Sequence, residues 1–90
     1  MNDHPICIAL SKRGLSEMME RIAAEHHVTV MELVGRVRLA HIVRARADFW
    51  LRLRDLGWSW NAIANIVDRD HTTVRQVVMA EQKRRAEAAA

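Results

Sequence analysis

The sequence predicts a small all-α domain, on three observations. The chain has 90 residues, half of them apolar, which is enough for a hydrophobic core. It has one proline, three glycines and no tyrosine, a composition that argues against a sandwich or barrel built on turns. Apolar residues recur at helical spacing, with capping residues between the periodic segments. We expect a lead-in with little structure over 1–14, one domain over 15–85, and a fraying helical or disordered tail over 86–90.

Two helices are predicted in the first half of the domain. Ser16 is a candidate N-cap for the first, which ends at His26 and His27. Its apolar residues form one core stripe: Leu15, Met18, Met19, Ile22 and Ala23. Thr29 and Glu32 have the spacing of a capping box for the second helix. Val30, Leu33 and Val34 are its predicted buried face, Gly35 is its predicted C-cap, and a basic loop GRVRLAH follows.

Three more helices are predicted in the second half. The first is long, from about 41 to 56, and its apolar residues cover more than one stripe, so it is expected to be central. Gly57 ends it, and Ser59 is the predicted cap of a short helix, WNAIANIV. A three-residue connection, DRD, then leads to a last helix capped by Asp70, with an inner stripe of Val74, Val77 and Val78.

Charge is unevenly distributed along the chain. Residues 1–35 hold three basic and five acidic side chains, whereas residues 36–85 hold eleven basic and five acidic ones. Most of the basic residues are arginines, whose planar donors suit phosphates and guanine edges. This half of the chain has two open interpretations, a surface for a polyanion or an ordinary solvated basic face.

Several function classes are not expected. A lone cysteine, Cys7, excludes an internal disulfide and fits a reducing compartment. No apolar run approaches the ~20 residues of a membrane span, and the N-terminus lacks the basic start of a signal peptide. Adjacent histidines at 26 and 27 point in different directions, which argues against a metal site. Asp70, His71 and Thr72 share one helix turn and cannot converge as a catalytic triad. We therefore expect a cytoplasmic, non-enzymatic protein with no cofactor and no membrane partner.

Two short helices joined by three residues have the spacing of a helix-turn-helix. In that motif the first turn of the second helix faces the major groove of DNA. Here the turn carries side chains that can donate to or accept from bases, and its backbone N–H groups can hold a phosphate: Asp70, His71, Thr72 and Thr73. The alternative is simple helix capping by Asp70.

The string RDHTTV, residues 69–74, resembles the hallmark of the DNA-binding C-terminal domain of the bacterial replication initiator DnaA. Three further segments are similar to that family: SEMMERIAAEHHVTVMELVGRVR, IVRARADFWLRLRDL and SWNAIANIVDRDHTTVRQVV. Together they cover about residues 15–85. The resemblance implies a DnaA domain IV-like helix-turn-helix fold, also described as Trp-repressor-like. It also implies double-stranded DNA with DnaA-box-like sites as the partner, in a nucleoid-associated protein.

The resemblance also implies roles for individual residues. The major-groove readers are Asp70, His71, Thr72 and Thr73, and Arg38 falls at the position of the family's minor-groove arginine. The expected phosphate contacts are arginines of the basic loop, the long helix and the last turn: Arg36, Arg44, Arg46, Arg54, Arg69 and Arg75.

The sequence also departs from the family's pattern. Asp68 and Arg69 form a turn one residue shorter than the family's, which has two glycines before the Arg-Asp pair. Trp58 and Trp60 stand where leucine and proline are typical, and Ala47 replaces a common glutamine. These departures affect which exact DNA site we expect the protein to bind, more than they affect DNA binding itself.

No GxxxxGK[ST] phosphate loop is present, so we expect no ATPase activity. A box-binding module of this kind, of bacterial or phage origin, fits either transcription regulation or competition for boxes during DNA replication. The alternative function is a helical protein-interaction module that docks a partner through Trp58, Trp60 or Met79.

Overall fold

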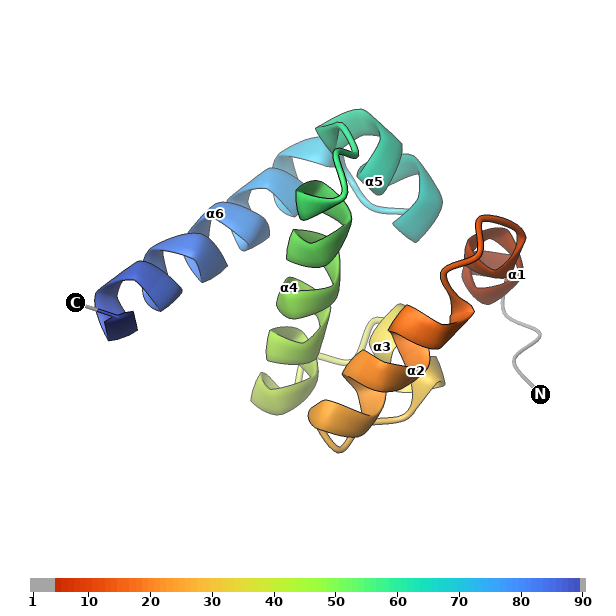
Figure 1. Cartoon of the computed structure of the whole chain (residues 1–90), viewed down its shortest axis with the longest axis horizontal. Coiled ribbons are helices and arrows are strands. Elements are labelled where there is room, and N and C mark those ends of the chain that lie inside the picture. The colour runs from red at the N-terminus through yellow and green to blue at the C-terminus, as the bar shows by residue number, and fades with distance from the viewer. Residues whose placement is uncertain (1–4, 90) are drawn as a thin grey trace. The chain divides into compact units, whose positions relative to one another are not determined.

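The computed structural model describes residues 5–89, which form six α-helices and no strand (Figure 1). These are α1 (Pro5–Lys12), α2 (Ser16–Glu25), α3 (Val30–Val34), α4 (Ala40–Asp55), α5 (Trp60–Val67) and α6 (His71–Ala89). The predicted all-α class is confirmed. Residue contacts divide the chain within α4 into two compact units, Met1–Arg46 and Ala47–Ala90.

Helix α1 corrects the prediction that residues 1–14 have little structure. Pro5 occupies its first position, where a fixed φ and a missing N–H cost nothing. Ile6, Cys7 and Leu10 are buried, and α1 packs on α2. The lead-in interpretation was therefore wrong for residues 5–12, while residues 1–4 lie outside the described part of the chain.

A tight turn joins α1 to α2. Gly14, at a φ of +73°, donates its N–H to Ser11 O, and Leu15 N–H reaches Leu10 O. This pair of bonds is the Schellman arrangement, which needs one left-handed residue. Ser16 is the first residue of α2, and its hydroxyl bonds Ser11 Oγ at 2.6 Å. The N-cap is Leu15, which makes no side-chain cap bond, so the prediction of Ser16 as cap was wrong.

The capping box at the start of α3 is confirmed in both directions. Thr29 Oγ1 accepts from Glu32 N–H at 3.0 Å, and Thr29 N–H donates to Glu32 Oε1 at 2.8 Å. Leu33 and Val34 are buried, and Gly35 is the C-cap. The core of this first unit also takes Met19, Ile22 and Ala23 from the predicted stripe of α2.

The end of α2 contains a residue in a costly backbone conformation. His27 has a φ of +56° and closes a Schellman turn, with Val28 N–H donating to Ala23 O. A side chain with a Cβ is strained in this left-handed region, whereas glycine is not.

We expect His27→Gly to raise the free energy of unfolding by roughly 0.5–1 kcal/mol, since it removes that strain. Ala24→Gly, one turn earlier on the exposed side of α2, is the matched control and should lower it by about the same amount. Urea denaturation of both variants measures the two signs. A destabilised His27→Gly protein would contradict the strain argument.

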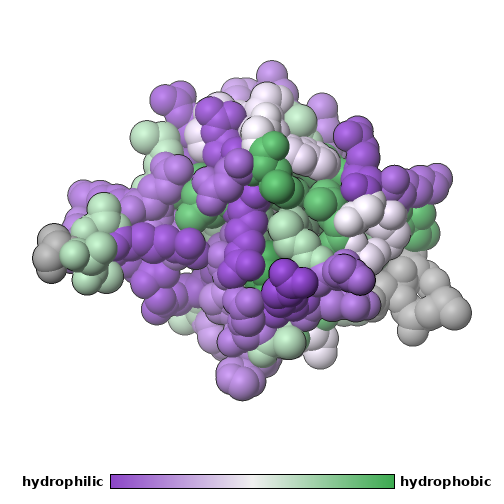
Figure 2. Space-filling model, viewed as in Figure 1, coloured by the Kyte–Doolittle hydropathy of each residue, from purple (hydrophilic) through white to green (hydrophobic). Residues whose placement is uncertain are grey.

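The second unit contains the remainder of α4 with α5 and α6. Gly57, at a φ of +97°, ends α4 as predicted, and Ser59 Oγ accepts from Ala62 N–H at 3.1 Å as the cap of α5. Helices α5 and α6 pack on each other through a core that includes Ile63, Val74 and Val78. Helix α6 continues to Ala89, so the described part of the predicted tail is helical (Figure 1). Figure 2 shows purple, hydrophilic side chains and pale green ones at this end of α6.

Candidate nucleic-acid interface

The connection between α5 and α6 consists of Asp68, Arg69 and Asp70. Asp68 has a φ of +55°, and Arg69 N–H donates to Ala64 O at 3.0 Å, which closes the end of α5. The Arg69 side chain turns back on the same end, where Nη1 donates to Val67 O at 3.0 Å and to Asp68 O at 3.3 Å. Arg69 therefore shapes the turn, with a half-buried side chain whose Cζ lies 6.0 Å from the Trp50 ring centroid.

The start of α6 presents four exposed polar residues, Asp70 directly before the helix and His71, Thr72 and Thr73 in its first turn. Val74 and Val78 are fully buried, and Thr72 and Thr73 lie on the other side of the helix from them. Asp70 and His71 lie on the same side of the helix as the two valines and are exposed at its N-terminal end. His71 Nδ1 lies 3.6 Å from the Asp70 carboxylate. The structure therefore brings the four predicted base readers together on one accessible helix turn.

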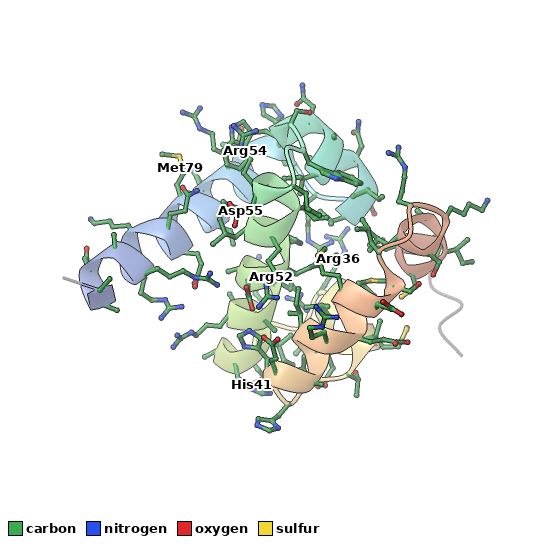
Figure 3. All side chains as sticks on the ribbon, in the orientation of Figure 1. Arg36, His41, Arg52, Arg54, Asp55 and Met79 are labelled. Carbon is green, nitrogen blue, oxygen red and sulfur yellow. The ribbon has the colours of Figure 1, made fainter. Side chains whose placement is uncertain are left out.

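Arg54 is engaged with the connection between α4 and α5. Its Nη1 donates to Trp58 O at 2.9 Å, and its Cζ lies 4.3 Å from the centroid of the Trp60 ring (Figure 3). This cation–π contact covers part of Trp60, which is half-buried. Arg54 thus helps to fix the start of α5, and its half-buried side chain is only partly accessible to a ligand.

The basic loop and the start of α4 carry several exposed cationic side chains of the first unit. Arg36 and Arg38 on the loop and Arg44 on α4 are exposed, as is His41 in the first turn of α4 (Figure 3). No aspartate or glutamate lies between Glu32 and Asp48 in the sequence. This stretch therefore has the local charge excess expected of a phosphate-binding segment.

Arg46 corrects the sequence-based assignment. Its side chain is only 6% exposed, and its guanidinium donates to three backbone carbonyls, Leu33 O, Val37 O and Glu32 O, at 3.2, 2.6 and 2.9 Å. These carbonyls belong to the end of α3 and to the basic loop, and the last carbonyls of a helix have no donor within the helix itself. Arg46 is thus an internal anchor of the loop in this structure, and its burial keeps it from a phosphate.

Sequence reasoning missed a charge cluster in the second unit. Asp48 and Glu81 are buried, at 4% and 5% exposure, and are surrounded by three arginines of α4 and α6. Asp48 Oδ1 accepts from Arg52 Nε at 3.0 Å and from Arg85 Nη2 at 2.9 Å. Glu81 accepts from Arg85 Nε at 2.7 Å and from Arg84. We call Asp48, Arg52, Glu81, Arg84 and Arg85 the α4–α6 charge cluster.

The cluster alters the acidity of Glu81. Burial alone raises the pKa of this carboxyl, but hydrogen bonds and charge attraction from Arg84 and Arg85 outweigh burial, and the pKa lies below its ordinary value of 4.5. Bonds to Glu81 and Asp48 correspondingly raise the pKa of Arg85. Glu81 therefore stays ionised at neutral pH although it is buried.

A local signal for part of the cluster is present in the sequence, because Glu81 precedes Arg84 and Arg85 by three and four residues. The Asp48–Arg85 pair spans 37 residues and has no such signal. Arg52, Arg84 and Arg85 are paired with carboxylates in this cluster, whereas the net charge of the sequence treats them as free cations. Among the predicted phosphate contacts, Arg36, Arg44 and Arg75 are the exposed ones, and Arg38, the predicted minor-groove reader, is exposed as well.

The residues of the alternative interaction surface are differently placed. Trp58 and Trp60 are half-buried, whereas Met79 on α6 is 49% exposed (Figure 3).

In the described residues, no group of three or more histidine, cysteine or acidic side chains is placed to hold a metal ion. No helix in that part of the chain has the length and apolar character of a membrane span. Comparison with protein-family models, curated proteins and solved structures gave no match to this chain.

Proposed function

We propose that this protein binds double-stranded DNA sequence-specifically, at DnaA-box-like sites, through a helix-turn-helix formed by α5 and α6. The observation that carries the proposal is the start of α6, where Asp70, the last residue of the three-residue connection, and His71, Thr72 and Thr73 of the first turn are all exposed. The resemblance of RDHTTV to the DnaA hallmark names the same four residues. Together these support a DnaA domain IV-like reader without ATPase or other enzymatic activity.

Base reading would come from the α6 turn. Inserted in the major groove, His71 and the threonine hydroxyls can donate to or accept from base edges, and a threonine methyl can pack on a thymine methyl. Asp70 can accept from a cytosine amine. The buried Val74 and Val78 hold this turn at a fixed rotation, so that the side chains meet bases in one register.

Affinity would come mainly from arginine–phosphate contacts. Arg36, Arg38, Arg44 and Arg75 supply exposed guanidinium groups, and Arg38 is also the proposed minor-groove reader. Arg54 and Arg69 are partly engaged within the protein, so we assign them first to the shape of the motif and second to phosphates. Each of the two units thus carries one candidate surface, the basic loop in the first and the α6 turn in the second.

The test is a titration of the purified protein against two labelled duplexes, one with a DnaA-type box and one scrambled, at two salt concentrations. We expect a preference for the box that persists at the higher salt, because base contacts release fewer counterions than phosphate contacts do. Weak, equal and salt-sensitive binding to both duplexes would remove the sequence-specific part of the proposal. No binding at either salt would remove the DNA proposal and favour a protein partner.

Arg44→Ala should weaken binding to both duplexes by the same factor and lower the slope of log K against log salt by about 1, because one phosphate contact is lost. The matched control is Arg21→Ala, which removes an exposed arginine of α2 and changes the net charge equally. Fluorescence anisotropy at several salt concentrations gives both slopes. Equal effects of the two substitutions would mean that only net charge matters.

A further inference from the structure

The basic loop carries exposed apolar side chains between its arginines. Both apolar residues lie in the five-residue segment that connects α3 to α4, where Val37 is 50% exposed and Leu39 is 56% exposed. Arg36 and Arg38, which alternate with them, are exposed as well. Val43, 38% exposed, is four residues after Leu39, and its N–H donates to Leu39 O, so the apolar surface continues onto the first turn of α4.

Arg46 holds this loop in place from the inside. Its shortest bond, 2.6 Å, goes to the carbonyl of Val37, the middle residue of the loop. Two further bonds tie the same guanidinium to the end of α3. A backbone anchored at Val37 cannot easily fold inward to bury the Val37 and Leu39 side chains, so their exposure is built into the loop.

Charge narrows the kind of partner that fits this surface. The stretch from Leu33 to Ala47 has four arginines and no acidic residue, and three of those arginines are exposed. The matching ligand is therefore polyanionic and also offers apolar surface between its charges. Duplex DNA has both, since phosphates line the minor groove, sugars form its walls, and base faces become accessible where a base step unstacks.

We propose that Val37 and Leu39 form an apolar wedge that enters the minor groove of duplex DNA and partly unstacks one base step, with Arg36 and Arg38 at the groove walls. Proteins that bind this groove use apolar side chains in that way. Arg46 is the positioning residue that holds the wedge outward. This inference rests on the proposed DNA-binding function, and it adds a distortion of the duplex to the base reading assigned to the α6 turn.

The test uses box-containing duplexes in which 2-aminopurine, a base whose fluorescence rises on unstacking, is placed at successive positions. We expect the unaltered protein to raise the fluorescence at one step. The Val37→Ser, Leu39→Ser double variant should lose that rise, while its Kd increases by about tenfold at most, because the arginine–phosphate contacts remain.

The matched control is the Ile8→Ser, Met31→Ser double variant. Ile8 and Met31 are both 46% exposed and belong to α1 and α3 of the same unit, not to the loop. This control should keep the full fluorescence rise. Arg46→Lys retains the positive charge but cannot reach three carbonyls in the same fork geometry, so it should reduce the rise more than it weakens binding. A thermal melt of each variant verifies that it is folded.

The outcomes separate the wedge from the proposed function. If the protein binds the box duplex and no 2-aminopurine position responds, or if the loop variant responds as the unaltered protein does, the wedge is overturned and DNA binding stands. If the protein binds no duplex, both fail. If vesicles containing phosphatidylserine bind the protein and lose binding in the loop variant, while duplex binding is unchanged, the apolar surface serves a lipid and the wedge is overturned.

Discussion

Replacing both His71 and Thr72 with alanine is expected to abolish most of the preference for a DnaA-type box over a scrambled duplex. Each good base contact contributes about 1–3 kcal/mol of discrimination, so the double variant should lose roughly 2–6 kcal/mol if the two contacts are independent. Both side chains are exposed in the first turn of α6, which leaves the buried Val74 and Val78 untouched. We therefore expect the fold and the affinity for scrambled DNA to change little.

The measurement is the ratio of the two dissociation constants at fixed salt. Gln82→Ala, an exposed substitution further along α6, is the control and should leave the ratio unchanged. Circular dichroism and a thermal melt exclude unfolding as the cause. A double variant that loses affinity equally for both duplexes would assign His71 and Thr72 to backbone contacts and would falsify the reader role.

The second large effect concerns the stability of the α4–α6 charge cluster. The Arg84→Ala, Arg85→Ala double variant leaves buried Glu81 without either of its cationic partners. An uncompensated buried charge commonly costs 3–5 kcal/mol, and the half-exposed arginine side chains reduce our expectation to about 2–3 kcal/mol. Lys83→Ala is the control, because Lys83 is largely exposed and reaches only Glu87, at 4.0 Å. Urea denaturation should show a small effect for Lys83→Ala.

The same cluster predicts a pH dependence with a defined sign. The pKa of Glu81 is lower in the folded protein than its ordinary value of 4.5, so the unfolded chain binds the proton more readily. The stability from Glu81 is therefore complete above pH 4.5 and is lost as the pH falls through the folded-state pKa. Glu81→Gln should flatten this part of the stability profile. If the free energy of unfolding of Glu81→Gln fell at acidic pH as it does in the unaltered protein, a group other than Glu81 would cause the fall.

Local signals made much of the fold predictable. The Thr29–Glu32 capping box, the Ser59 cap and the buried Val74 and Val78 each depend on residues within one or two helix turns, and all were confirmed. Helix α1 was missed because its eight residues are too few to establish a helical apolar period, although Pro5 at a helix start was an available signal.

The candidate site was less predictable, because an arginine's role depends on what lies around it after folding. Arg44 and Arg46 are two residues apart on one helix, yet Arg44 is exposed and Arg46 is buried against carbonyls 9 to 14 residues away. Nothing in local spacing separates the two. The Asp48–Arg85 bond has the same character, since it joins residues that are distant in the sequence.

The engagement of arginines inside the protein has a consequence for how it would search DNA. Arg46 donates to carbonyls, and Arg52, Arg84 and Arg85 donate to two buried carboxylates. These four arginines are engaged within the protein, so a phosphate backbone meets fewer cations than the composition suggests. Because each phosphate contact adds to non-specific affinity, such a protein would stay only briefly on random sequence. It would leave quickly where the α6 turn finds no matching bases, and its residence time would become long only at a true site.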